Sequence, residues 1–254
     1  MWDHINGKFL VTLLSGIFVS VFSLARLIHY LLANNPIQLW SFFFGLIIIS
    51  AIMVSKEIKK WNFKVVIAGI VGVVIAYFIT EATPASTPEN PFFIFFSGAI
   101  AICAMILPGI SGSFILLILG KYEFIISAVK DMNIMVVGIF AAGCVAGLLS
   151  FSRLVSWLLK KYHNATVAVL SGFMIGSLNK IWPWKETIST RMNSKGEIVP
   201  LIQNNILPDQ YLQKTGNDPH FLQALLFFAV GILIVVIIEK IAVMMDSGKK
   251  QDPL

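Results

Sequence analysis

Long, unbroken runs of apolar residues dominate this chain, and short polar segments separate them. Each run holds roughly 20 residues, the length of helix that crosses a hydrocarbon core about 30 Å thick. The runs show no regular alternation of apolar and polar positions, which favours helices over the strands of a membrane barrel. The pattern predicts membrane helices over residues 8–32, 37–55, 62–80, 134–159, 164–181 and 220–245.

One further apolar segment, residues 92–130, is interrupted in its middle. Residues 107–113 read L-P-G-I-S-G-S, which combines helix-breaking proline and glycine with small polar side chains. Irregular backbone at membrane depth is tolerated only where it is buried in protein or lines a polar cavity. We therefore expect a broken hairpin or re-entrant loop with residues 108–113 as the turn at its tip.

The chain also nearly repeats itself at an offset of 127 residues. Identical residues coincide without a gap: Asn6 with Asn133, Gly16 with Gly143, Arg26 with Arg153, Gly45 with Gly172, and Ser50 with Ser177. Internal duplication in a membrane protein is typical of secondary transporters, whose working site lies where the repeats meet.

The distribution of lysines orients the two copies in the membrane. Residues 56–64, the pair Lys160 and Lys161, and the lysines near the C-terminus are expected to be cytoplasmic. Helix 8–32 then runs outward and helix 134–159 runs inward, so the repeats have opposite topology. We expect one all-α, polytopic transmembrane domain over residues 1–254. Its first repeat covers about 1–80, its second covers about 92–245, and residues 182–219 form an extramembrane loop.

Composition agrees with a membrane protein and removes other classes of function. The chain is 57% hydrophobic and 13% charged, with a mean hydropathy of +0.83. Its net charge of +6 is explained by the cytoplasmic loops, so nucleic acid is not an expected partner. Histidines and cysteines lack the spacing of metal ligands, and no ATP-binding loop is present, so no metal or cofactor is predicted. Transport would then be passive or coupled to an ion gradient.

The turn at residues 108–113 is the strongest local candidate for a binding site. Pro108 and Gly109 interrupt the helix, and Gly112 permits close approach of backbone to a ligand. Ser111 or Ser113 would cap a helix that begins near residue 114, leaving unpaired amides that attract an anion. The alternative is an ordinary helix–helix turn with a serine cap.

Two arginines, Arg26 and Arg153, are equivalent under the repeat and lie inside apolar runs. Each is about 10 Å from the end of its predicted helix, at about 1.5 Å per residue. If both faced one cavity, they would clamp a phosphate through paired N–H donors. The alternative is that each side chain extends to the interface.

Tyr122 and Glu123 follow the second half of the broken segment. Glu123 is a candidate for proton coupling or gating, and the alternative is a surface ion pair with Lys121 or Lys130. Glu81 is interpreted as a residue that marks the end of helix 62–80.

Residues 98–123, GAIAICAMILPGISGSFILLILGKYE, resemble the PopT-type family of bacterial polyprenyl-phosphate transporters, long catalogued as a domain of unknown function. The resemblance extends over nearly the whole chain. It implies a translocase that returns undecaprenyl phosphate across the bacterial cytoplasmic membrane for reuse in cell-envelope synthesis, with that lipid and the surrounding membrane lipids as partners. Carried over by motif, the head-group candidates are Pro108, Gly109, Ser111, Gly112, Ser113, Tyr122 and Glu123.

The chain departs from the family pattern in one respect. Family members carry two Pro-Gly-x-Ser-Gly turns, one in each repeat, and this sequence contains one. The 127-residue offset places the partner of Pro108 before Met1, so the first repeat is expected to lack its hairpin. A late start codon, a fragment and a true loss are the three explanations.

Two other functions remain as alternatives. Undecaprenyl-pyrophosphate phosphatases also resemble inverted repeats with a Pro-Gly-x-Ser turn, but theirs continues Arg-Ser-Gly, whereas Gly112 and Ser113 follow Ser111 here. A transporter of a small anion is the second alternative.

Overall fold

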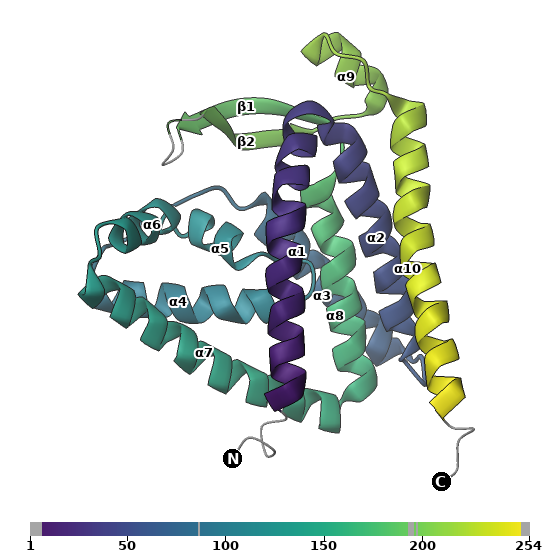
Figure 1. Ribbon diagram of the computed structural model, residues 1–254, viewed down its shortest axis with the longest axis horizontal. Coiled ribbons are helices and arrows are strands. Elements are labelled where there is room, and N and C mark those ends of the chain that lie inside the picture. The colour runs from purple at the N-terminus through teal and green to yellow at the C-terminus, as the bar shows by residue number, and fades with distance from the viewer. Residues whose placement is uncertain (1–6, 86, 193–195, 197, 250–254) are drawn as a thin grey trace.

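The computed structural model describes residues 7–85, 87–192, 196 and 198–249. A helical bundle carries a small two-stranded sheet at one end (Figure 1). Its elements are α1 (Gly7–Asn34), α2 (Pro36–Lys56), α3 (Phe63–Glu81), α4 (Pro91–Ile106), α5 (Gly112–Ile118), α6 (Tyr122–Lys130), α7 (Ile134–Lys161), α8 (His163–Ser177), the 3-10 helix η1 (Leu178–Ile181), β1 (Lys185–Met192), β2 (Ile198–Asn205), α9 (Pro208–Thr215) and α10 (Phe221–Lys249).

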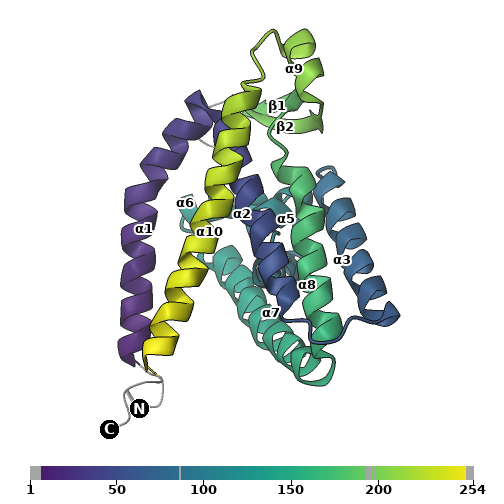
Figure 2. The ribbon, with the colours of Figure 1, turned by 90° about the vertical axis from the view of Figure 1, so that its right-hand side faces the viewer.

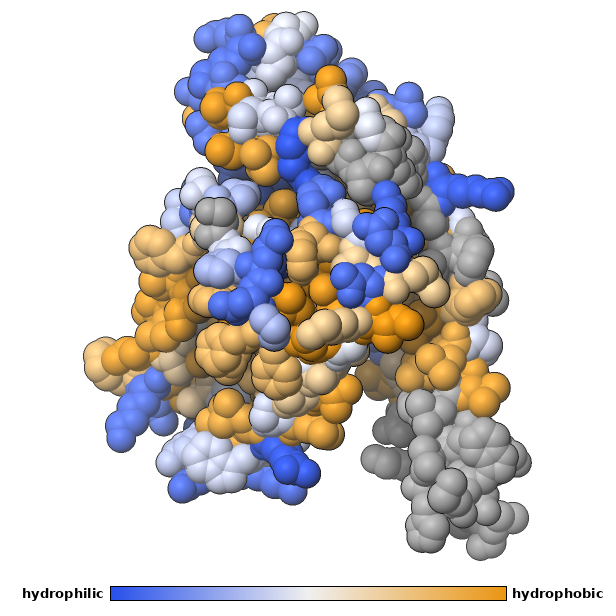
Figure 3. Space-filling view, turned by 90° about the vertical axis from the view of Figure 1, so that its left-hand side faces the viewer, coloured by the Kyte–Doolittle hydropathy of each residue, from blue (hydrophilic) through white to orange (hydrophobic). Residues whose placement is uncertain are grey.

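Each of the six apolar runs forms a helix as predicted, although the run 164–181 changes from α-helix to the 3-10 helix η1 after Ser177. Within the described residues, α2, α3, α7 and α10 are each long and apolar enough to cross a membrane. A mostly apolar band lies between more hydrophilic upper and lower ends on the face seen in Figure 3. The protein is therefore a multi-pass membrane protein, because apolar surface of this extent is stable only in contact with lipid.

The two repeats have opposite orientations along the bundle axis. The connection from α1 to α2 lies at the top of Figures 1 and 2, and the equivalent connection from α7 to α8 lies at the bottom. We call the lower end the lysine-rich face, since Lys56, Lys59, Lys160 and Lys161 lie there. We call the opposite end the hairpin face, after the β1–β2 hairpin that lies there.

The two repeats pack together through their second and third helices. The second helix of each repeat packs along the third helix of the other: α2 along α10, and α8 along α3. The two second helices, α2 and α8, also touch each other at the centre. The arrangement matches the inverted-repeat architecture that the 127-residue offset predicts.

The interrupted segment forms the expected broken hairpin. Helix α4 packs on α7 and ends at Ile106, and Leu107 takes an extended conformation because a residue before proline disfavours the helical region. The chain then returns through α5 and α6, whose axes differ by 108°. Gly143 of α7 lies so close to α4 that an added Cβ would overlap the carbonyl oxygen of Phe95.

The equivalent surface of α1 is open. Gly16 corresponds to Gly143 in the repeat, yet no atom of the described residues lies within 4 Å of a Cβ built on it. Helix α1 accordingly makes few contacts beyond α2.

The segment 182–219 was predicted only as a loop, and that description is incomplete. It folds into the antiparallel β1–β2 hairpin followed by α9. Trp182 and Trp184 donate their indole N–H groups to the carbonyls of Ile206 and Pro219, which closes the segment on itself. Trp184 is also buried with Ile37 of α2 and Ala224 of α10, which ties the segment to the bundle. Thr, Ile and Val residues on both sides of Gly196 carried a strand signal, but the strands are too short and polar to stand out beside the membrane runs.

Candidate functional site

The hairpin turn, residues 108–113, lies where the two repeats meet. Ile110 of the turn and Ile115 of α5 are buried in one cluster with Ala76 of α3 and Phe173 of α8. Because α3 belongs to the first repeat and α8 to the second, the turn contacts both halves of the molecule. A relative movement of the repeats would therefore change the surroundings of the turn.

Both glycines of the turn are required by close packing. Gly109 has a φ of 88°, and an added Cβ would overlap the hydroxyl of Ser177, the last residue of α8. At Gly112, an added Cβ would press into Ala101 and Met105 of α4. The glycines thus allow the turn to lie against α8 on one side and α4 on the other.

The two serines of the turn are exposed, and their hydroxyl oxygens lie 2.8 Å apart. Helix α5 begins at Gly112, earlier than predicted, and Ser111 takes the N-cap position without a capping bond from its side chain. The expected serine cap is therefore absent at α5. The two hydroxyls form a pair that shares one hydrogen bond and keeps further donor and acceptor capacity.

Two lysines that no sequence motif indicated lie near α5, the helix that follows the turn. The ammonium nitrogen of Lys180, in η1, is 4.4 Å from the ring centre of Phe114, the residue after Ser113. The Nζ of Lys185 donates to the carbonyl oxygen of Lys180 at 2.5 Å. Burial and, to a smaller extent, the positive charge of Lys180 together lower the pKa of Lys185 to about 8. The charges of Lys180 and Lys185 therefore act on each other, and the carboxylate of Glu81 also acts on Lys180.

A polar network connects this region to α3. The side-chain amide of Asn179 donates to the carboxylate of Glu81 at 2.5 Å, and Asn205 of β2 donates to the side-chain oxygen of Asn179 at 2.7 Å. Glu81 ends α3, as expected, and also helps to hold η1. The network fixes the segment that carries Lys180.

The structure does not bring the two repeat-related arginines together. Arg26 and Arg153 are exposed, and each lies eight residues before the last residue of its helix, α1 or α7. Those helix ends are at opposite faces of the molecule (Figure 1). Arg153 lines a shallow polar pocket of about 360 Å³ with Trp157 and Lys160. The arginines therefore occupy separate positions on the two sides of the protein.

Tyr122 and Glu123 contact the β1–β2 sheet. Glu123 forms an ion pair with Arg191 of β1, whose guanidinium carbon lies 5.7 Å from the ring centre of Tyr122. Lys121 is buried, and its Nζ donates to the carbonyl oxygen of Thr87 at 2.6 Å. Tyr122 and Glu123 thus attach α6 to the sheet, and Lys121 holds the loop between α3 and α4.

This chain is similar to known proteins of one family. The family profile of VCA0040-like proteins, described as undecaprenyl phosphate translocase-like, matches residues 1–199. A relative from Vibrio cholerae serotype O1, named polyprenyl-phosphate transporter, is 47% identical over 242 residues, covering 95% of this chain and 79% of its own. A protein of the same name from Staphylococcus aureus is 30% identical over 194 residues, covering 69% of this chain and 68% of its own. No solved structure matches the chain.

Proposed function

Since this chain belongs to the undecaprenyl phosphate translocase-like family, we propose that it carries undecaprenyl phosphate between the leaflets of the bacterial cytoplasmic membrane. The lysine-rich face would be cytoplasmic, because positive residues concentrate on the inner side of membrane proteins. The lipid would return to that side for reuse in cell-envelope synthesis.

The contact of the hairpin turn with both repeats carries the proposal. A phosphate monoester cannot cross hydrocarbon as an unpaired anion, since the desolvation penalty amounts to several kcal/mol per ion or more. The hydroxyls of Ser111 and Ser113 would supply hydrogen bonds, and Lys180 and Lys185 would supply positive charge. The backbone at Pro108, Gly109 and Gly112 would hold these groups at the junction of α3, α4 and α8.

Movement would come from rocking of one repeat against the other. The exchanged helix pairs, α2 with α10 and α3 with α8, connect the halves, so a small rotation about the α2–α8 contact alters access to the turn from each side. Arg26 and Arg153 would attract the phosphate at their own sides of the membrane. They would not form one clamp.

Glu123 and Tyr122 would act in gating. Their contact with Arg191 attaches the β1–β2 hairpin to α6, so loss of the ion pair would free the sheet on the hairpin face. Protonation of Glu123 is one way to release it, which would couple opening to the proton gradient.

Purified protein in liposomes tests the proposal against its two alternatives. We expect transfer of labelled undecaprenyl phosphate between leaflets, no release of phosphate from undecaprenyl pyrophosphate, and no flux of inorganic phosphate. Phosphate release would favour the membrane phosphatase, and flux of inorganic phosphate alone would favour a transporter of small anions. A Lys180→Gln change should slow lipid transfer. Lys214→Gln is the matched control. Lys214 of α9 pairs with Glu186 of β1, so this change also removes one lysine charge but leaves the proposed phosphate site intact.

A further inference from the structure

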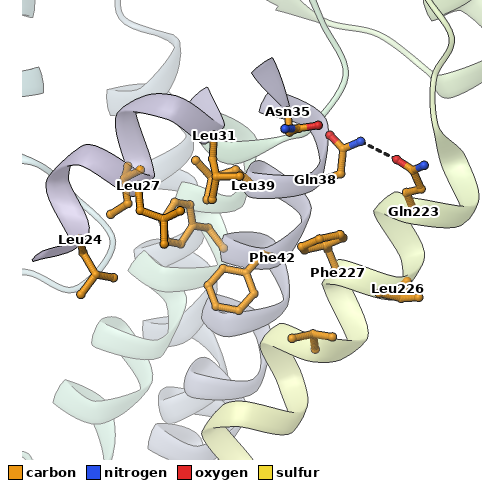
Figure 4. Close-up of a pocket in the computed structure, with 13 residues that line it drawn as sticks. Leu24, Leu27, Leu31, Asn35, Gln38, Leu39, Phe42, Gln223, Leu226 and Phe227 are labelled. Atoms are coloured by element: carbon orange, nitrogen blue, oxygen red, sulfur yellow. Dashed lines mark hydrogen bonds between the residues drawn. The ribbon is translucent and has the colours of Figure 1, made fainter. Parts of the chain in front are cut away.

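Two apolar pockets lie at equivalent places in the two repeats. The first-repeat pocket, of about 670 Å³, is bounded by α1, α2 and α10 (Figure 4). The second-repeat pocket, of about 420 Å³, lies mainly between α7 and α8. Both are lined almost entirely by hydrophobic side chains.

Most residues that α1, α2 and their connection contribute to the first-repeat pocket correspond, at the offset of 127, to residues that α7, α8 and their connection contribute to the second. Leu24, Ile28, Leu31, Leu39, Phe42 and Phe43 line the first-repeat pocket. Their counterparts Phe151, Val155, Leu158, Thr166, Val169 and Leu170 line the second-repeat pocket. The repeat has changed most of these side chains but has kept a hollow at the bend between its first and second helices. Accidental gaps in packing would not recur at the same positions.

The pockets reach opposite ends of the bundle. Asn35, at the α1–α2 connection on the hairpin face, lines the first-repeat pocket, and its counterpart Tyr162 lines the second-repeat pocket at the lysine-rich face. The inverted repeats therefore provide one apolar pocket for each side of the membrane.

Each pocket carries polar groups at its mouth. Gln38 and Gln223, joined by a hydrogen bond of 2.6 Å between α2 and α10, lie at the rim of the first-repeat pocket (Figure 4). At the second-repeat pocket, the ammonium of Lys161 lies 5.5 Å from the ring centre of Tyr162. An apolar interior with a donor-rich mouth fits an amphiphile whose head is an anion.

The second-repeat pocket also continues to the hairpin turn. Leu107, the residue before Pro108, lines this pocket together with Phe173, which packs against Ile110 of the turn. A chain lying in the pocket would therefore reach the serine pair at one end and the lysine-rich face at the other.

We propose that each of the two pockets binds part of the isoprenoid tail of the transported lipid, one on each side of the membrane. This inference rests on the proposed function. The tail would enter the pocket at one face, leave it as the phosphate passes the turn, and settle into the repeat-equivalent pocket at the other face. Specificity for a branched, unsaturated chain would come from these pockets, because a phosphate site alone cannot recognise the tail.

Photolabelling in liposomes tests the proposal with the full chain. The probe is a polyprenyl phosphate with a photoreactive group in its tail, and labelled residues are identified by mass spectrometry. We expect labels on both sets of lining residues, displaced by undecaprenyl phosphate but not by a straight-chain phosphatidic acid. Labels spread evenly over lipid-exposed helix faces, or equal displacement by phosphatidic acid, would overturn the proposal.

Pocket-filling variants add a second measurement. Ile28→Trp and Val155→Trp should each reduce labelling of their own pocket about tenfold, the loss expected when about two methylene groups lose their burial. Leu32→Trp and Leu149→Trp are the controls, because these exposed leucines of α1 and α7 do not line the pockets. Unchanged labelling in both filled variants would count against tail binding.

The two proposals fail in different ways. Transfer of undecaprenyl phosphate without labels in the pockets would leave the proposed function standing and remove the tail sites. Displaceable labels in both pockets, without any transfer of lipid, would support the tail sites and contradict transport.

Discussion

Gly45 and Gly172, which lie 127 positions apart, make the same contact in opposite halves of the molecule. A Cβ added to Gly45 of α2 would overlap the carbonyl oxygen of Phe228 in α10, and a Cβ added to Gly172 of α8 would overlap that of Gly69 in α3. Each glycine lets the second helix of its repeat touch the backbone of the other repeat's third helix. Small residues allow such close approach between membrane helices.

A second pair of contacts obeys the same symmetry. Gly72 lies against the carbonyl of Val169, and Gly231 lies against that of Phe42. The second helices correspond at an offset of 127, whereas the third helices correspond at 159. The difference arises because residues 182–219 lengthen the connection before α10. The inverted repeat is thus visible in individual backbone contacts.

These contacts predict the effect of filling the glycine positions. Gly45→Leu or Gly172→Leu should lower the free energy of unfolding by about 1–3 kcal/mol, because overpacking forces the helices apart. Thermal unfolding in detergent would measure the change. Gly16→Leu is the control, since the structure leaves open space beside Gly16. Equal destabilisation by all three changes would contradict the role of these contacts.

The lowered pKa of Lys185 predicts a pH dependence of phosphate binding. Lys185 titrates at about 8 in the folded protein, so its positive charge disappears as the pH rises through that value. Head-group binding should weaken between about pH 7 and 9, with the phosphate itself already doubly ionised above its second pKa of about 6. Lys185→Arg should remove this decline, because arginine stays charged throughout. Binding of the lipid phosphate should be measured from pH 7 to 9 for the wild type and for Lys185→Arg. The same pH dependence in both proteins would contradict a role for Lys185.

Titration of Lys185 should change the stability of the fold in the opposite direction to phosphate binding. The unfolded chain binds the proton of Lys185 more tightly than the folded chain, whose pKa is depressed by burial and by Lys180. Stability should therefore rise with pH between about 8 and 10.5, the window between the folded and unfolded values. Below pH 8 the destabilising effect is fully present. The Lys185→Met variant should lose this dependence in unfolding experiments, and a wild-type slope of opposite sign would contradict the assignment.

The ion pair between Glu123 and Arg191 predicts how the sheet is held. Glu123→Gln should increase hydrogen exchange in β1 and β2, because the sheet loses its attachment to α6. The effect should be near 1 kcal/mol or below, since both side chains are partly exposed to solvent. Exchanging the charges, with Glu123→Arg and Arg191→Glu together, should restore protection. Glu186→Gln, which removes the more exposed pair with Lys214, provides a comparison.

The helices and their inverted repeat could be predicted because they depend on local information. Apolar runs determine membrane helices, and a fixed offset reveals duplication. The break at Pro108 and Gly109 was likewise visible in the residues themselves.

The composition of the site could not be predicted in the same way. Lys180 contacts Phe114 of α5, and Lys185 contacts Lys180, only in the folded chain, and no pattern near these lysines signals such contacts. The arginine pair suggested one shared cavity, but an inverted repeat places equivalent residues on opposite sides. Symmetry in the sequence therefore identified equivalent positions without showing which of them meet.

Transfer of labelled undecaprenyl phosphate between the leaflets of liposomes tests the central claim most directly, with the wild-type protein compared with the Ser111→Ala, Ser113→Ala double variant. We expect rapid transfer by the wild type and at least about tenfold slower transfer by the variant, because hydrogen bonds to a charged group contribute about 1.5–3 kcal/mol. Both proteins should insert and unfold alike, since the two hydroxyls are exposed. Transfer at the wild-type rate by the variant would contradict phosphate binding at the turn.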